Sequence, residues 1–374
     1  MPERVLTAAW VILIAGLYLW AIKSIPASVS TKGPPAQTYA GVVREVQANG
    51  FTLDLASGGL EGQRVAVELP FETGIYPLKI GVGDSVVVQP MAAPGQPGNE
   101  HWIFRDTVRL PALYALAAIF CIAVVLIGGS RGIASLLGLL FSFLVLARFL
   151  IPLLAAGVNP ILVSVLGGCA ILVVTQYLAH GLNAKTTVAI AGTAASLAVS
   201  GLLAGYFVTA AHLSGATEES AQVQAMVPES ASDLSALLLA GMIVGVVGLL
   251  ADVTVGQSAV VFALRDANPA LRGRDLYRRA MSVGHDHNAS LVYTLVLVYA
   301  GAALPLMLLF SAEGFTLGAV LNHEDVATEV VRMLIGSLGL VAAVPITTAL
   351  AAFVAEHREP APAGTEDAMH GHVH

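Results

Sequence analysis

Charged residues are scarce in this chain, and the usual signatures of a soluble enzyme are missing. Asp, Glu, Lys and Arg make up 11% of the 374 residues, against about 25% in an ordinary soluble domain. The formal net charge is -7, with no basic stripe, which excludes a nucleic-acid binder. No Gly-Lys-Ser or Gly-Lys-Thr phosphate loop occurs, which excludes ATP hydrolysis through that motif. The two cysteines, Cys121 and Cys169, lie in apolar runs, which argues against a disulfide framework.

Apolar residues account for 56% of the chain and gather in long runs. A membrane span needs roughly 20 mostly apolar residues, and a helix satisfies its own backbone groups in lipid. The runs predict eight transmembrane helices, at about Leu6–Ile25, Ala112–Gly129, Ile133–Ala155, Pro160–Ala179, Thr187–Ala211, Leu234–Ala251 with an apolar extension to Leu264, Ala289–Phe310 and Val330–Ala355.

The first run could be an uncleaved anchor or a cleaved signal peptide. Its apolar stretch is longer than a typical signal core and contains Trp10, Tyr18 and Trp20, which favours the anchor. Cleavage would leave seven spans and would not change the orientation of the rest.

The distribution of basic residues predicts the orientation. With the N-terminus in the cytoplasm, the inner segments hold Arg4, Arg131, Lys185, Arg265, Arg272, Arg274, Arg278, Arg279 and Arg358. The opposite loops, at about Ile151–Asn159, His212–Asp233 and Ser311–Glu329, hold no Lys or Arg. Because basic residues collect on the cytoplasmic side of short loops, both termini are predicted to be cytoplasmic.

The segment that follows the first span has the pattern of a small β domain. Tyr39–Val46 and Phe51–Leu55 alternate apolar and polar residues around Asn49-Gly50, a dipeptide typical of tight hairpin turns. Three more strands are predicted at Arg64–Leu69, Asp84–Gln89 and Trp102–Val108. About five short strands favour a barrel of the OB-like or SH3-like kind, outside the cytoplasm.

These patterns predict a polytopic α-helical membrane protein with a small all-β extracytoplasmic domain. The expected organisation is an anchor helix at 1–25, the β-rich domain at 37–110, a seven-helix membrane domain at 112–355 and a disordered cytoplasmic tail at 356–374. The tail ends in His370, His372 and His374. A weak metal-binding tract is the alternative reading of that tail.

The sixth span carries the most informative polar residue. Gly241, Gly245, Gly248 and Asp252 recur at helical spacing along one face. Glycines of this kind let a neighbouring helix approach closely, and a carboxylate at the bilayer centre costs roughly 2.5–3.5 kcal/mol. We therefore expect this face to meet a packed helix or a wet cavity. Asp252 is read either as a proton or cation relay or as a marker of the inner end of the span.

Residues on the inner side add further candidates. The long run from Leu237 to Leu264 must either project into the cytoplasm or break near Gly256, which places Gln257 near the inner interface. The next segment interleaves Leu271, Leu276, Met281 and Val283 with Arg residues and predicts an amphipathic helix on the membrane surface. The predicted surface anchors are Arg265, Arg272, Arg274, Arg278 and Arg279.

A His-Asp-His cluster precedes the seventh span. His285, Asp286, His287 and Asn288 are candidates for interfacial proton exchange or for ion pairing with the Arg residues. A metal site is not expected, because i and i+2 point to different faces of a helix and further ligands at suitable spacing are missing. In the eighth span, Gly336, Gly339 and Ala343 form a second small-residue face.

Several local motifs resemble those of the YibE/F family of bacterial multi-spanning membrane proteins. The residues that carry the resemblance are Gly248–Gln257, Asn268-Pro269, Leu276–Ala280, Gly284–His287, Thr294–Gly301 and Ala343–Leu350. The span count and the soluble segment after the first span also look like this family. Ala251 and His285 depart from the more polar residues expected there, which argues against a second carboxylate beside Asp252. The resemblance implies a membrane location and transport, without specifying a substrate.

We expect secondary transport of a small solute or ion, with Asp252 and Asp286 as coupling groups and no enzymatic activity, cofactor or metal. The expected partners are the lipid bilayer, the transported solute and, as an alternative, a second copy of the chain. One rival is a non-transporting sensor or assembly factor that binds a partner through the Gln37–Arg109 domain. A second rival is a membrane-embedded metal-dependent enzyme built around His285 and His287.

Overall fold

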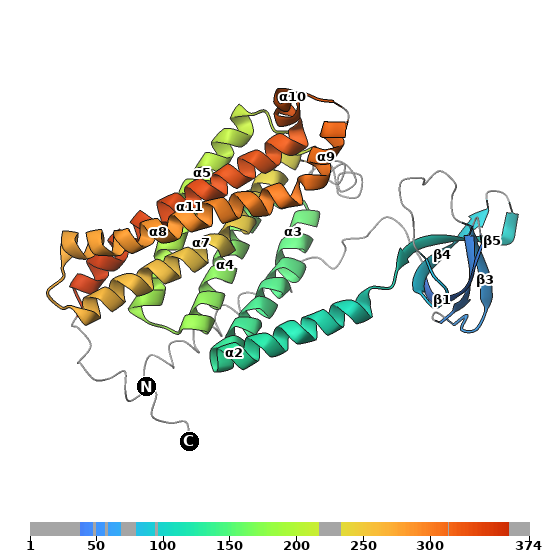
Figure 1. The fold of residues 1–374 in the computed structure, drawn as a ribbon, viewed down its shortest axis with the longest axis horizontal. Helices are drawn as coiled ribbons and strands as arrows, with labels where there is room; N and C mark the ends of the chain where they lie inside the picture. Colours follow the sequence, from blue (N-terminus) through green and yellow to red (C-terminus); the bar gives the residue numbers. More distant parts are fainter. Residues whose placement is uncertain are drawn as a thin grey trace, which may run out of the picture. The chain divides into compact units, whose positions relative to one another are not determined.

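The structure is a computed structural model that describes residues 38–47, 50–56, 59–68, 80–93, 96–216, 233–312 and 314–358. The predicted first span and nearly all of the tail lie outside the described residues, as does Asn49 of the predicted hairpin turn. Two compact units are present, one ending at Ile127 and the other beginning at Gly128 in the described part of the chain. Figure 1 shows the small β unit and the larger helical unit, which are described separately here.

The β unit confirms the expectation of a small barrel. Five strands form a closed barrel in the order β1-β2-β3-β5-β4. Their bounds are β1 Tyr39–Gln47, β2 Gly50–Leu55, β3 Arg64–Glu68, β4 Ser85–Ala93 and β5 Gln96–Thr107. The alternating apolar residues point inward, so that Val43, Leu53, Val86 and Val88 are completely buried.

A bulge in β1 shapes the outer face of this barrel. The β1–β2 register shifts between Val43 and Glu45, which makes Arg44 the extra residue of the bulge. The Nε atoms of Arg44 and Arg64 donate to the two oxygens of Asp54 at 2.7 and 2.9 Å. These two guanidinium groups, Arg64 first, hold the pKa of the Asp54 carboxyl below its ordinary value. The three charged side chains therefore join the neighbouring strands β1, β2 and β3.

The helical unit and the helix that leads into it follow the predicted apolar runs. Their elements are α2 Leu110–Val145, the π-helical turn Leu146–Leu150, α3 Ile151–Ala155, α4 Pro160–His180, α5 Ala184–Ala210, α7 Leu234–Ala267, α8 Gly273–Ala302, α9 Leu304–Ala312, α10 Leu317–Asn322 and α11 Glu324–Glu356. Asn159, Asn183 and Asp233 cap the first turns of α4, α5 and α7 with their side-chain oxygens.

The described residues contain five helices long and apolar enough to span a membrane, or six if α8 and α9 form one span bent by 57°. These helices correspond to seven of the eight predicted spans, because two predictions fall on one helical run. Leu110–Ala155 is 46 residues long, or roughly 69 Å at 1.5 Å per residue. Gly129 interrupts it with non-helical angles, φ 54° and ψ -133°. The run is therefore long enough for the two predicted passes, with a break between them.

Two predictions about continuity are resolved. α7 runs unbroken through Gly256, so the alternative of a break there is wrong. α8 begins at Gly273 and continues into the seventh predicted span. The amphipathic helix predicted for the Arg-rich segment is the first half of this longer helix, and its position at the membrane surface stays a prediction. The bend between α8 and α9 lies beside Pro305, the second residue of α9, where proline breaks helical hydrogen bonding.

α5, α7 and α11 form the centre of the helical unit, with α4 packed on α7 and α8 packed on α7 and α11 (Figure 1). The apolar core between them includes Leu172, Leu250, Leu340, Ala343 and Val344. Ala343 is completely buried, and a Cβ built on Gly339 would meet Leu250 at 3.5 Å as well as Ser200. The predicted small-residue face of the eighth span is therefore confirmed as a packing face.

Candidate functional site

Buried hydroxyl groups line the contact between α5 and α7. The Oγ1 atoms of Thr193 and Thr254 lie 2.6 Å apart, and both residues are completely buried. Thr193 also donates to the carbonyl of Ala189, one turn earlier. On the same face of α5, Ser196 and Ser200 are buried, and no described residue provides a hydrogen-bond partner for the Ser200 hydroxyl. This set was not predicted from the sequence, although residues 193, 196 and 200 have helical spacing.

Gln257 connects three helices. Its Nε2 atom donates to the Ala280 carbonyl of α8 at 3.1 Å and to the Thr348 Oγ1 of α11 at 2.7 Å. The side chain is 4% exposed, and the absence of a side chain at Gly284 leaves the space it occupies, since a Cβ there would lie 2.9 Å from Oε1. Gln257 was predicted to couple transport near the interface. Its amide hydrogens are instead committed to holding the bundle together.

Asp252 lies on a different face of α7. Its side chain is exposed, and no hydrogen bond or ion pair joins it to another described residue. The charge of Asp252 interacts with that of His180, at the end of α4. The charges of Lys185 and Arg131 in turn interact with the His180 imidazole. Asp252 is thus within electrostatic reach of His180, the last residue of α4.

The glycine face that precedes Asp252 does not pack as predicted. Gly241, Gly245 and Gly248 are exposed, and a Cβ added to each would meet no described atom within 4 Å. The expectation that this face meets a neighbouring helix is therefore wrong for the described residues. Close helix contacts form instead at other glycines, where Gly168 meets Val247 and Gly192 meets Thr347. The glycine face beside Asp252 is therefore not covered by any described helix.

The His-Asp-His cluster of α8 points outward. His285, Asp286 and His287 are exposed, and the described residues contain no group of three His, Cys, Asp or Glu able to hold a metal ion. Asn288 differs from them, because its Oδ1 atom is buried and has no described partner. The structure therefore separates Asn288, on the inward side of α8, from the three residues before it.

The predicted Arg anchors divide into two kinds. Arg272, Arg274, Arg278 and Arg279 are exposed, in agreement with a surface position. Arg265 is 3% exposed, and its Nη1 atom donates to the carbonyls of Pro269 and Leu271. Arg265 is therefore not a surface anchor: it holds the turn that follows α7.

Comparison with known proteins places these helices in a family. No curated protein and no solved structure matches the chain. The family model described as YibE/F-like protein matches residues 116–357, which include Asp252, Gln257, the α8 cluster and every helix from α4 to α11. On this match, together with the apolar helices that could span a membrane, the chain belongs to the YibE/F family.

Proposed function

We propose that the chain moves a small solute or ion across a membrane by a secondary mechanism, with Asp252 as the coupling group. The observation that carries the proposal is an ionisable carboxylate within an apolar helix, without a hydrogen bond or ion pair to any described residue. A charged side chain at membrane depth is costly, and such residues mark ion or proton paths. Nothing in the packing of α7 needs this carboxylate.

The contrast with Gln257 supports the choice of Asp252. A coupling group must gain and lose a proton or cation without unfolding its surroundings. Gln257 cannot do so, because its hydrogen bonds hold α8 and α11 in place. Asp252 has only the charge interaction with His180 to lose, and no described atom lies within 4 Å of a Cβ built on any of the three glycines before it. His180 is then the group that responds when Asp252 changes its charge.

The proposal includes the predicted setting: a bacterial plasma membrane with both termini in the cytoplasm. In that orientation α4 ends and α5 begins on the inner side, so Asp252 and His180 lie towards the cytoplasm. The proximity of Lys185 and Arg131 supports this placement, because basic residues favour the inner side.

Flux in proteoliposomes tests the role of Asp252. Proton movement would be followed with an internal pH dye under an imposed gradient, with Na+, K+ and Mg2+ offered in turn. Asp252→Asn keeps the shape and loses the charge, so we expect normal insertion and no coupled flux. Asp266→Asn, on the exposed end of the same helix, is the matched control and should retain the wild-type rate. Wild-type flux in Asp252→Asn, or wild-type protein no faster than empty vesicles, would contradict the proposal.

A further inference from the structure

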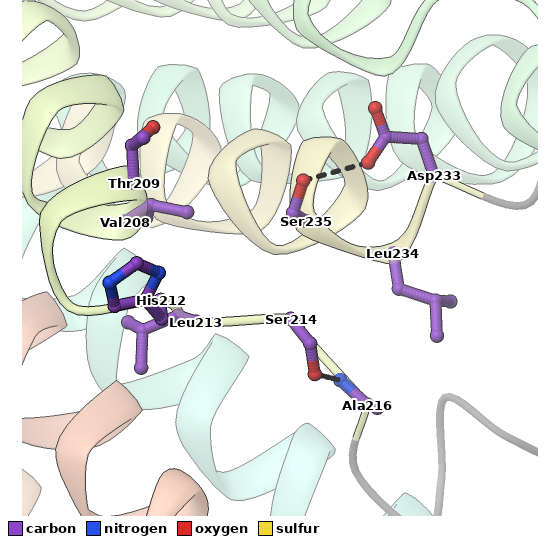
Figure 2. Close-up of a pocket in the computed structure, with 9 residues that line it drawn as sticks. All are labelled: Val208, Thr209, His212, Leu213, Ser214, Ala216, Asp233, Leu234 and Ser235. Atoms are coloured by element: carbon purple, nitrogen blue, oxygen red, sulfur yellow. Dashed lines mark hydrogen bonds between the residues drawn. The ribbon is translucent and has the colours of Figure 1, made fainter.

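An open-sided pocket of about 500 Å³ lies where α5 ends and α7 begins, far along both helices from Asp252. Its volume is within the range of roughly 300–1,000 Å³ that small-molecule sites occupy. Figure 2 shows the residues that form it. They are Val208, Thr209, His212, Leu213, Ser214, Ala216, Asp233, Leu234 and Ser235.

One wall of this pocket is firmly held. Oε1 of Glu324, the first residue of α11, accepts hydrogen bonds from the backbone N–H and the hydroxyl of Ser214, both at 2.7 Å, and from the N–H of Gly215 at 2.9 Å. The preceding Leu213 is 5% exposed and packs among Val208, Met242 and Ile335. The pocket therefore has an apolar floor and a wall fixed to a third helix.

Asp233 gives the pocket a negative charge. Its Oδ1 atom accepts from the N–H of Ala236 at 3.0 Å and from the Ser235 hydroxyl at 2.7 Å, and these hydrogen bonds lower the pKa of the carboxyl. A carboxylate offers about four acceptor positions, so the group can still bind a further donor. Asp233 is therefore ionised at neutral pH and able to receive a ligand.

His212 supplies the second polar group. Its backbone has φ 53°, and among the described residues it is the one non-glycine with a positive φ. No described residue forms a hydrogen bond with its ring. Figure 2 shows His212 and Asp233 on different sides of the pocket, one at the end of α5 and the other at the start of α7. The hydroxyls of Thr209 and Ser214 already donate to Gly205 and Glu324.

The charge of the pocket lining favours a cation. Asp233 is the one acidic residue among the lining residues, and none of them is Lys or Arg. A site whose charge has one sign raises the local concentration of the opposite sign. The apolar walls and the volume suit an organic molecule. A metal ion would find only Asp233 and His212 among the charged or imidazole side chains of the pocket, too few for a closed site.

We propose that this pocket binds a small organic cation, with its ammonium group on Asp233 and its apolar body against Val208, Leu213 and Leu234. The site does not depend on the role of Asp252, because binding here requires no flux. It would serve as the entry point if the transported solute is itself an amine.

Calorimetry with three probes tests the proposal. Full-length protein in nanodiscs of zwitterionic lipid would be titrated at neutral pH with n-butylamine, n-butanol and n-butyrate, which share an apolar body and differ in charge. We expect saturable binding of n-butylamine, weaker binding of n-butanol and none of n-butyrate. Absence of saturable n-butylamine binding, or equal binding of n-butyrate, would overturn the proposal.

The variants separate charge from fold. Asp233→Asn keeps an N-cap oxygen for α7 and removes the charge, so the affinity for n-butylamine should fall by about tenfold or more at an unchanged Tm. His212→Asn tolerates the left-handed backbone and should weaken n-butylamine binding less than Asp233→Asn. Asp266→Asn is the control and should bind as the wild type does. Equal affinity in the wild type and Asp233→Asn would refute the site even if flux through Asp252 were confirmed.

Discussion

The contact between Gly192 and Thr347 makes the packing of α5 on α11 directly testable. A Cβ built on Gly192 would lie 3.1 Å from Thr347 Cβ and 3.2 Å from its Cγ2, and closer still to the Oγ1 atom. Thr347 is completely buried, and a β-branched side chain in a helix has few rotamers to retreat to. Gly192→Ala should therefore push the two helices apart.

The size of the effect follows from a comparison on the same helix. A Cβ at Gly201 would meet nothing within 4 Å, so Gly201→Ala should gain only the helix propensity of Ala, about 1 kcal/mol. Gly192→Ala receives the same gain but adds the cost of overpacking, about 1–3 kcal/mol. The propensity cancels in the difference, so Gly192→Ala should be about 1–3 kcal/mol less stable than Gly201→Ala.

Thermal unfolding of the purified protein in one detergent would measure this difference. Thr347→Ala provides the rescue, because the Thr347 hydroxyl has no described hydrogen-bond partner to lose. In that background, Gly192→Ala should be less damaging than in the wild type. Equal Tm values for the two glycine variants, or no rescue by Thr347→Ala, would show that α5 and α11 do not pack through this contact.

Two further predictions concern the barrel and the helix that follows it. Because the folded pKa of Asp54 is lowered, its contribution to barrel stability is present above the unfolded pKa of about 4 and is lost as pH falls through the folded value. Trp102 fluorescence in a Trp10→Phe, Trp20→Phe background should report this loss of stability in acid. Asp54→Asn should remove that part of the pH dependence. Identical acid unfolding profiles for Asp54→Asn and its parent protein would contradict the prediction. Gly129→Ala should destabilise the protein by about 1–3 kcal/mol, because an L side chain rarely adopts the backbone angles of Gly129. Gly128→Ala is the control and should be tolerated, because Gly128 lies in open space without a positive φ. An unchanged Tm for Gly129→Ala would show that α2 does not break there.

The parts of the structure that sequence reasoning predicted are those governed by local periodicity. The alternation in Tyr39–Val46 and Phe51–Leu55 was sufficient for the hairpin of the barrel, because one face of each strand is buried. Uninterrupted apolar runs located α4, α5, α7 and α11, because a long apolar segment in lipid can satisfy its backbone polar groups only as a helix. The Gly336–Ala343 face was recognised because its small residues repeat at helical spacing.

The predictions that were wrong concern the rotation of each helix about its own axis, which decides the face that meets a neighbour. α7 is apolar on nearly all sides, so its sequence does not indicate which face meets a neighbour. Gly245 and Gly248 could therefore be read as a packing face although the structure leaves them open. The role of Gln257 depends on Thr348, which is 91 residues away in sequence, and no local pattern predicts such a pair. The exposure of Asp252 follows from the same rotation of α7.

The closed barrel constrains how a partner could recognise the β domain. Within the described strands each one has neighbours on both sides, and the ring closes between β3 and β5 through Val67 with Trp102 and Glu68 with Ile103. Where strands pair on both sides, a binding peptide could not add a strand, the usual way in which an exposed edge captures an extended segment. The outer parts of β4 and β5, Gln89–Ala93 and Gln96–His101, pair only with each other and keep an open edge. Recognition at the closed part of the ring would have to depend on side chains such as Arg44, which the bulge turns outward, or on the loops. Mutations that abolish binding should therefore map to outward-facing positions and leave the ladder of backbone hydrogen bonds intact.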